Sequence, residues 1–338
     1  MRIAISAYDR GSSGISSYTL ELAKLLSSDV RVSLIAFDDV EVPGVEVLPI
    51  RLPSRPRALP LLTFLRNRGE VAEALRGYDV VHETLPPWGS PAERLVTTRW
   101  GYVSYLGLVR VRMAGLSFPE NLGALPVTLQ HYVMDSASRR RAAHVIDVSS
   151  ESPNFVPPMM EPGRPKDYGC SGRLRLLFVS RDLGMPRKNL RVVLEALRLV
   201  RAPVELHLVG GGRIPGRPPV PTVSHGPLPR EGVTALMREV DLLVLPSTYE
   251  ELGFVGLEAY SVGLPAITSD IPSFRAIYRP SPKFPPGDPR ALAGIIDGLS
   301  CGELERLGRS ELEHLRAMNE AARRKLMAIY RCALGSRD

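Results

Sequence analysis

The sequence is poor in the residues that build disulfide frameworks and metal sites. Its 338 residues include three cysteines, which stand far apart at Cys170, Cys301 and Cys332, and no CxxC pair occurs. The six histidines are scattered, without the spacing that is typical of a zinc site. We therefore expect no disulfide framework and no metal, and the cysteine usage favours a reducing, cytoplasmic location.

Long apolar runs are missing as well. No segment approaches the ~20 consecutive apolar residues of a membrane span, and Met1–Tyr8 is typical of a first strand rather than a signal peptide. Aromatic residues make up only 6% of the chain, and no aromatic platform with interleaved basic residues accompanies the net charge of +7. Nucleic acid is therefore not an expected partner.

What the sequence does contain is an alternation of short apolar segments with helical patterns. It begins with a strand at 2–8, a glycine turn and a helix marked by Tyr18, Leu22 and Leu26, and it restarts at 174–180. A Pro- and Gly-rich stretch at 152–173 separates the two halves and predicts a linker. We expect two α/β domains, each a doubly wound parallel sheet, with ligands bound at the carboxyl ends of the strands and in the cleft between the domains.

The most informative segment follows a predicted strand at 241–245. Glu250 comes after the end of this strand, Glu258 lies in the first turns of the next helix, and seven residues separate them. Gly253 allows the backbone to approach a ligand closely, and a helix that begins there offers unpaired N–H groups to a phosphate. Carboxylates accept hydrogen bonds, so two of them beside an anion site suit the hydroxyls of a sugar and a ribose.

This segment resembles the signature of the retaining glycosyltransferases of family 4, which have the two-domain GT-B fold. Leu252 stands where the family usually has Phe, and Glu251 where it has Gly or Ser. The residues that fit the signature are Ser247, Glu250, Gly253, Glu258, Ala259, Gly263 and Pro265.

The resemblance extends to both sides of the signature. Arg181 and Lys188 match two family cations that hold the donor pyrophosphate, and Arg187 beside Lys188 is a second basic side chain within reach of a phosphate. Leu228 belongs to the loop that lies against the nucleobase in the family. In the first half, Gly14 resembles the glycine turn that approaches the donor phosphates.

The resemblance implies the function and the roles of these residues. It implies a retaining, hexosyltransferase-like enzyme that moves a sugar from a nucleotide-diphosphate sugar to an unknown glycan, lipid-linked or small-molecule acceptor, with no metal and no cofactor. Glu250, Arg181 and Lys188 would be catalytic, and Glu250 would contact the transferring sugar with help from the backbone at Gly253 and Phe254. Glu258 would bind the ribose hydroxyls, and fixed cations would stabilise the departing diphosphate.

The same resemblance gives the expected domains. Residues 1–160 form an acceptor-side Rossmann-like domain, residues 161–317 a donor-binding Rossmann-like domain, and the helix in 318–338 crosses back to the first domain.

Two alternatives and one further partner stay open. A nucleotide-sugar epimerase can share this fold, and a non-catalytic nucleotide-sugar-binding subunit would explain why Arg99 stands where the family often has a His-Asp pair. Arginines between positions 51 and 68 alternate with leucines in a stretch without acidic residues. This stretch is either a helix that contacts anionic lipid at the inner face of the membrane or an ordinary solvated basic face.

Overall fold

The computed structural model describes residues 1–7, 14–36, 41–49, 68–85, 92–100, 129, 132–133, 136–169 and 172–335. Internal contacts divide the chain into two compact units. Unit 1 consists of Met1–Met159 together with Asn319–Asp338, and unit 2 consists of Met160–Met318.

Unit 1 is built on a parallel sheet that contains six strands among the described residues, in the order β3-β2-β1-β4-β5-β6. This order is that of a dinucleotide-binding sheet, whose topological switch point lies between its first and fourth strands. The strands are β1 (Arg2–Ala7), β2 (Arg31–Ala36), β3 (Glu46–Pro49), β4 (Val80–Leu85), β5 (Leu95–Arg99) and β6 (His144–Asp147).

The helix α1 (Gly14–Leu26) packs against β1, β2 and β4. Its side chains at Tyr18, Leu22 and Leu26 are buried and recur every four residues, so they form one apolar face toward the sheet. The strand and the helix expected at the N-terminus are thus present, and most of the glycine turn between them lies outside the described residues. A second described helix, α3 (Arg68–Ala74), buries Val71 in the core of this unit.

Unit 2 repeats the same topology. Its described residues form six parallel strands in the order β12-β11-β10-β7-β8-β9, so β7 and β10 flank the switch point. The prediction of two doubly wound parallel sheets is therefore confirmed. The strands are β7 (Leu174–Asp182), β8 (Val204–Gly211), β9 (Thr222–Ser224), β10 (Leu242–Leu245), β11 (Ala266–Ser269) and β12 (Lys283–Phe284).

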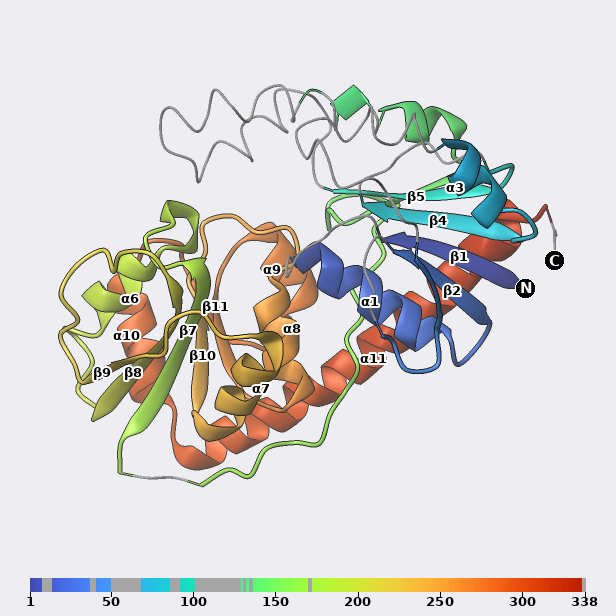
Figure 1. Cartoon of the computed structure of the whole chain (residues 1–338). Helices are drawn as coiled ribbons and strands as arrows, with labels where there is room; N and C mark the ends of the chain where they lie inside the picture. Colours follow the sequence, from blue (N-terminus) through green and yellow to red (C-terminus); the bar gives the residue numbers. More distant parts are fainter. Residues whose placement is uncertain are drawn as a thin grey trace. The chain divides into compact units, whose positions relative to one another are not determined.

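Helices cover both faces of the sheet in unit 2, with α6 and α10 on one face and α7 and α8 on the other (Figure 1). The largest apolar core lies under α6 and α10 and includes Phe178, Leu206 and Ile296. The helical elements of unit 2 before α11 are η1 (Pro186–Lys188, a 3-10 turn), α6 (Leu190–Ala196), α7 (Arg230–Glu239), α8 (Phe254–Ser261), α9 (Pro272–Ile277) and α10 (Pro289–Gly298).

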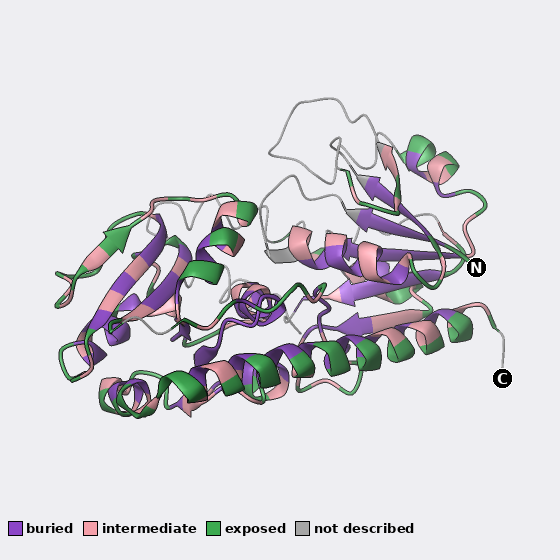
Figure 2. Ribbon diagram, turned by 90° about the horizontal axis from the view of Figure 1, so that it is seen from below, coloured by how far each residue is buried: buried purple, intermediate pink, exposed green. Residues whose placement is uncertain are grey.

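The helix α11 (Cys301–Ala333) contributes to both units, because the division between them falls within it at Met318. In unit 2 the buried Glu311 accepts hydrogen bonds from the Ala266 N–H (Oε2, 3.1 Å) and the Ser281 hydroxyl (Oε1, 2.7 Å). In unit 1 the Tyr330 hydroxyl lies 2.7 Å from His82 Nδ1. The strands are largely buried, whereas α11 alternates between buried and exposed residues along its length (Figure 2).

Two expectations need correction. The segment before β7 is not a free linker throughout, since the N–H groups of Gly163 and Lys166 each donate to the end of α8, at Ser261 O and Val262 O, over 2.8 Å. We expected no disulfide framework, but the fold does contain a disulfide, because Cys301 is disulfide-bonded, whereas Cys332 is free. In the segment before β7, residues bond to a part of the chain that lies about a hundred positions away.

Candidate functional site

The candidate site of unit 2 lies at the switch point of its sheet. β7 leads into the turn η1, and β10 leads into the loop that carries Glu250. These two strands are direct neighbours, so the segments that follow them leave the same edge of the sheet side by side. The Thr248 N–H donates to Arg187 O over 2.8 Å and joins the two segments.

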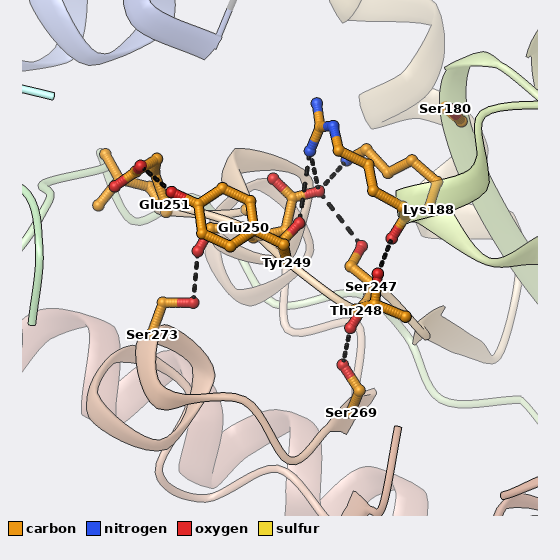
Figure 3. A network of polar contacts seen from close by, with 12 residues as sticks. Ser180, Lys188, Ser247, Thr248, Tyr249, Glu250, Glu251, Ser269 and Ser273 are labelled. Carbon is orange, nitrogen blue, oxygen red and sulfur yellow. Dashed lines mark hydrogen bonds and ion pairs between the residues drawn. The ribbon is translucent and has the colours of Figure 1, made fainter. Parts of the chain in front are cut away.

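Two cations converge on the carboxylate of Glu250 (Figure 3). Lys188 Nζ lies 2.6 Å from Glu250 Oε1, and Arg187 Nη1 lies 3.0 Å from the same oxygen. The Ser247 hydroxyl also donates to Oε1, over 3.2 Å. The structure therefore brings together Lys188 and Glu250, two residues that the sequence singled out, and places Arg187 beside them.

The cations set the charge of Glu250. Burial alone would raise the pKa of this carboxyl, because a low-dielectric environment disfavours the ionised form. Lys188 and Arg187 outweigh burial and lower the pKa below its usual value. Glu250 is thus an ionised carboxylate at neutral pH, with positive charge beside it.

Hydrogen bonds from a third segment hold the Glu250 loop in place. The Ser273 hydroxyl donates to the carbonyl oxygen of Glu250 over 2.7 Å, and the Ser269 hydroxyl donates to the carbonyl oxygen of Ser247 (Figure 3). Both serines are buried and come from the end of β11 and the start of α9. Because the loop is fixed from two sides, Glu250 is already in position before a ligand arrives.

The loop ends at Gly253, which precedes α8 and has a left-handed backbone with φ of 64°. A Cβ at this position would lie 2.7 Å from Phe274 Cε1, so only glycine fits. The Tyr278 hydroxyl donates to the carbonyl oxygens of Leu252, over 2.9 Å, and Gly253, over 2.6 Å. The predicted glycine turn and helix start are present, and Phe254 is the buried first residue of α8.

Glu258 lies on α8 and pairs with a residue that the sequence reading missed. Arg230 Nε lies 3.1 Å from Glu258 Oε1, and Arg230 Nη2 donates to Met160 Sδ over 3.1 Å. Arg230 is the first residue of α7 and follows Leu228, which is half-buried in the loop after β9. An arginine at a helix start looks like any surface charge in a sequence, and only the packing of α7 against α8 gives it a partner.

The remaining predicted residues lie near these elements or in the other unit. Arg181 is exposed near the end of β7, and the ion pairs of Glu250 with described residues are those of Arg187 and Lys188. Gly14 begins α1 in unit 1, after the switch-point strand β1.

Glu251, which departs from the family pattern, accepts a hydrogen bond from the Tyr249 hydroxyl (Figure 3). Burial raises the pKa of Glu251 above its usual value, and the nearby Glu250 adds to this effect, although the Tyr249 hydrogen bond and Arg187 oppose it. Two consecutive carboxyl groups thus have opposite pKa shifts, because only Glu250 contacts the cations.

In unit 1, Arg99 forms an ion pair with Asp147. Its Nε and Nη2 atoms bind both oxygens of the buried Asp147, with Nη2 at 2.5 Å from Oδ2. His82 is buried between Tyr330 and Thr98, each 2.7 Å from a ring nitrogen. Burial lowers the pKa of His82 to about 3, so this imidazole is neutral at physiological pH.

Neither the basic stretch at 51–67 nor Cys170 falls within the described residues. Among the helices that the structure describes, none is long and apolar enough to cross a membrane. The described histidine, cysteine and acidic side chains form no cluster of three or more that could hold a metal ion.

Residues 173–300 match the family model described as glycosyl transferases, group 1. No curated protein matches the sequence. Three solved structures illustrate the likeness of the whole chain. Sucrose-phosphate synthase from Thermosynechococcus elongatus has a TM-score of 0.66 and 19% identity, over 98% of each chain. A glycosyltransferase from Rickettsia africae has a TM-score of 0.62 and 16% identity, over 99% of each chain.

The third structure is HepE from Anabaena, in complex with UDP and glucose. It has a TM-score of 0.59 and 14% identity, over 97% of this chain and 100% of that one. At these identities the three structures establish the fold, which extends over both units.

Proposed function

We propose that the protein is a glycosyltransferase, because residues 173–300 match the family model of group 1 glycosyl transferases and the chain has a GT-B fold. The donor is a nucleotide-diphosphate sugar bound by unit 2. The acceptor is a glycan, a lipid-linked sugar or a small molecule, and transfer retains the anomeric configuration.

One observation carries the proposal, which is the cluster of Lys188, Arg187 and Glu250 at the switch point of the sheet. A nucleoside diphosphate gains negative charge as it leaves the sugar, and fixed cations at that point stabilise the transition state. The turn η1 carries both Arg187 and Lys188, and Arg181 lies one residue before the end of the preceding strand β7. These three cations supply the positive charge, so the proposed reaction is metal-independent and needs no cofactor.

The carboxylates supply contacts to hydroxyl groups. Glu250 is ionised and therefore accepts hydrogen bonds from the transferring sugar, with the backbone at Gly253 and Phe254 beside it. Glu258 binds the ribose hydroxyls, and Leu228 lies against the base. In the retaining mechanism that we propose, the acceptor attacks from the side of the leaving phosphate, whose oxygen accepts the acceptor's proton.

The similar structures support a nucleotide donor. HepE was solved with UDP-glucose, and TarM from S. aureus was solved with UDP. We also propose that the basic stretch at 51–68 contacts anionic lipid at the inner face of the membrane. Co-sedimentation that is no stronger with anionic than with neutral vesicles would refute that contact.

The first test is calorimetric titration with UDP, GDP and ADP, repeated on Glu258→Ala. Micromolar binding of one nucleotide, weakened in the variant, is the expected result, and it identifies the donor class. Incubation of that donor with candidate acceptors then separates the alternatives. A transferase yields glycosylated acceptor, an epimerase changes the donor without acceptor, and a non-catalytic subunit binds the donor and changes nothing. If none of the three nucleotides binds, the proposed function is wrong.

A further inference from the structure

The ion pair between Arg230 and Glu258 links two segments of the candidate site. Glu258 belongs to α8, which follows β10, and Arg230 opens α7, which follows β9. The side chain of Glu258 is only 12% exposed, and Arg230 Nε lies 3.1 Å from its Oε1 atom. A carboxylate in this environment keeps one orientation only if a partner holds it, because burial removes the water that would otherwise solvate it.

The position of Arg230 does not serve its own helix. Cations are unfavourable at a helix N-terminus, where the helix dipole places partial positive charge. Arg230 is the first residue of α7, and the residue before it, Pro229, provides no side-chain cap. A charge that opposes the local preference in this way is a sign that it acts on something other than its own helix.

The guanidinium is held on both sides. While Nε contacts Glu258, Nη2 donates to the sulfur of Met160, which is buried and is the first residue of unit 2. A planar group with several donors in fixed directions can make both contacts at once, whereas the single ammonium of a lysine cannot keep this geometry. Arg230 is therefore a fixed support for the carboxylate.

We infer that Arg230 is a positioning residue that aims the carboxylate of Glu258 at the ribose and thereby makes the site selective for ribonucleotides over 2′-deoxyribonucleotides. This inference rests on the proposed function, in which Glu258 accepts hydrogen bonds from the ribose hydroxyls. A carboxylate in the correct orientation accepts a hydrogen bond from the 2′-hydroxyl of a ribose. A deoxyribose lacks this hydroxyl, so the hydrogen bond does not form and affinity is lost. Replacing Arg230 removes this contact to the carboxylate, so the preference for a 2′-hydroxyl is expected to fall.

The test is calorimetric titration of the full chain with UDP, GDP and ADP and with their 2′-deoxy counterparts. The wild type is expected to prefer the ribonucleotide that it binds about tenfold over the deoxy form, the loss of one charge-assisted hydrogen bond. In Arg230→Met the preference falls to about twofold or less, and Arg230→Lys lies between the two. Arg275→Met is the matched control, because Arg275 forms an ion pair with Asp270 (2.6 Å) on another element, and it keeps the full preference.

The outcomes separate the inference from its premise. If the wild type binds none of the nucleotides, the proposed function fails, and the inference fails with it. If the wild type binds one nucleotide and both Arg230 variants keep its full ribose preference, Arg230 does not position Glu258, although the proposed function stands. An equal loss of affinity for both sugars, with an unchanged ratio, also overturns the inference, because it shows a merely structural role. Should Arg230→Met fail to fold, Arg230→Lys decides alone.

Discussion

Lys188 Nζ lies 2.6 Å from Glu250 Oε1, and this ion pair joins the turn after β7 to the loop after β10 across the switch point of the sheet. Glu250 thus contacts the cation that the proposed donor diphosphate needs. The carboxylate and the diphosphate compete for the same positive charge. Because of this competition, mutating Glu250 and mutating Lys188 should have opposite effects on the affinity for the diphosphate.

Replacing Glu250 by Gln is expected to separate binding from transfer. The amide keeps the shape of the side chain but releases Lys188 and Arg187, so affinity for the nucleoside diphosphate rises by about threefold to tenfold. Transfer falls by about 100-fold or more, because the sugar loses a charged acceptor. Calorimetry and product formation measure the two effects. A fall in nucleotide affinity would contradict the competition, and Glu195→Gln, on α6, is the control.

Removing either cation is expected to weaken nucleotide binding unequally. The side chain of Lys188 is 17% exposed and that of Arg187 is 31% exposed, so water screens Arg187 more. Lys188→Ala should lower the affinity about 10- to 100-fold and Arg187→Ala about 3- to 10-fold. Added salt should reduce the loss of affinity in Arg187→Ala more than the loss in Lys188→Ala. Arg191→Ala is the control, because Arg191 is 77% exposed and pairs within α6 with Glu195. Equal losses for Arg187 and Lys188 would contradict this ranking.

The strands of both sheets were predictable because buried parallel strands appear as nearly continuous apolar runs. β10 is Leu-Leu-Val-Leu, and all four of its residues are buried. β9 and β12 escaped prediction because they are only three and two residues long, Thr222–Ser224 and Lys283–Phe284, too short to show a period. The composition of 152–173 predicts a linker, because proline and glycine are equally common in a free loop and in an extended segment that is hydrogen-bonded to unit 2.

The candidate site was predictable where a spacing fixes the geometry, and it was missed where a partner comes from elsewhere. The interval from Glu250 to Glu258 spans one loop and one helix start, so local structure determines where both residues lie. The pairing of Glu258 with Arg230 joins two helices that are 28 positions apart in sequence at these residues. No local pattern encodes that contact, which only the packing of α7 on α8 produces.

Gly253→Ala is expected to destabilise unit 2 by about 2–4 kcal/mol, because it combines a strained left-handed backbone with overpacking. The new Cβ would lie 2.7 Å from Phe274 Cε1, and φ at this position is 64°. Gly294→Ala in α10 is the matched control, since its Cβ meets nothing within 4 Å. The control should stabilise the protein by about 0.5–1 kcal/mol. Chemical denaturation measures both, and an unchanged midpoint for Gly253→Ala would contradict the prediction.

His82 should make the stability of unit 1 depend on pH. Burial lowers its pKa from 6.5 to about 3 in the folded protein, so between these values the unfolded chain binds one proton more than the folded one. Stability is then fully present above pH 6.5 and falls as the pH drops toward 3. The slope from one proton is about 1.4 kcal/mol per pH unit. His82→Gln should lower stability at pH 7 and remove this component of the slope.

Tyr330→Phe is the control for this prediction. It deletes the hydroxyl that lies 2.7 Å from His82 Nδ1 but leaves the imidazole buried, so it should cost about 1 kcal/mol and keep the slope. Denaturant titrations from pH 4 to 8 on the wild type and both variants measure the difference, with the remaining titrating groups common to all three. If the stability of His82→Gln depends on pH as that of the wild type does, His82 already binds its proton in the folded state. The conclusion that its imidazole is neutral between Tyr330 and Thr98 would then be wrong.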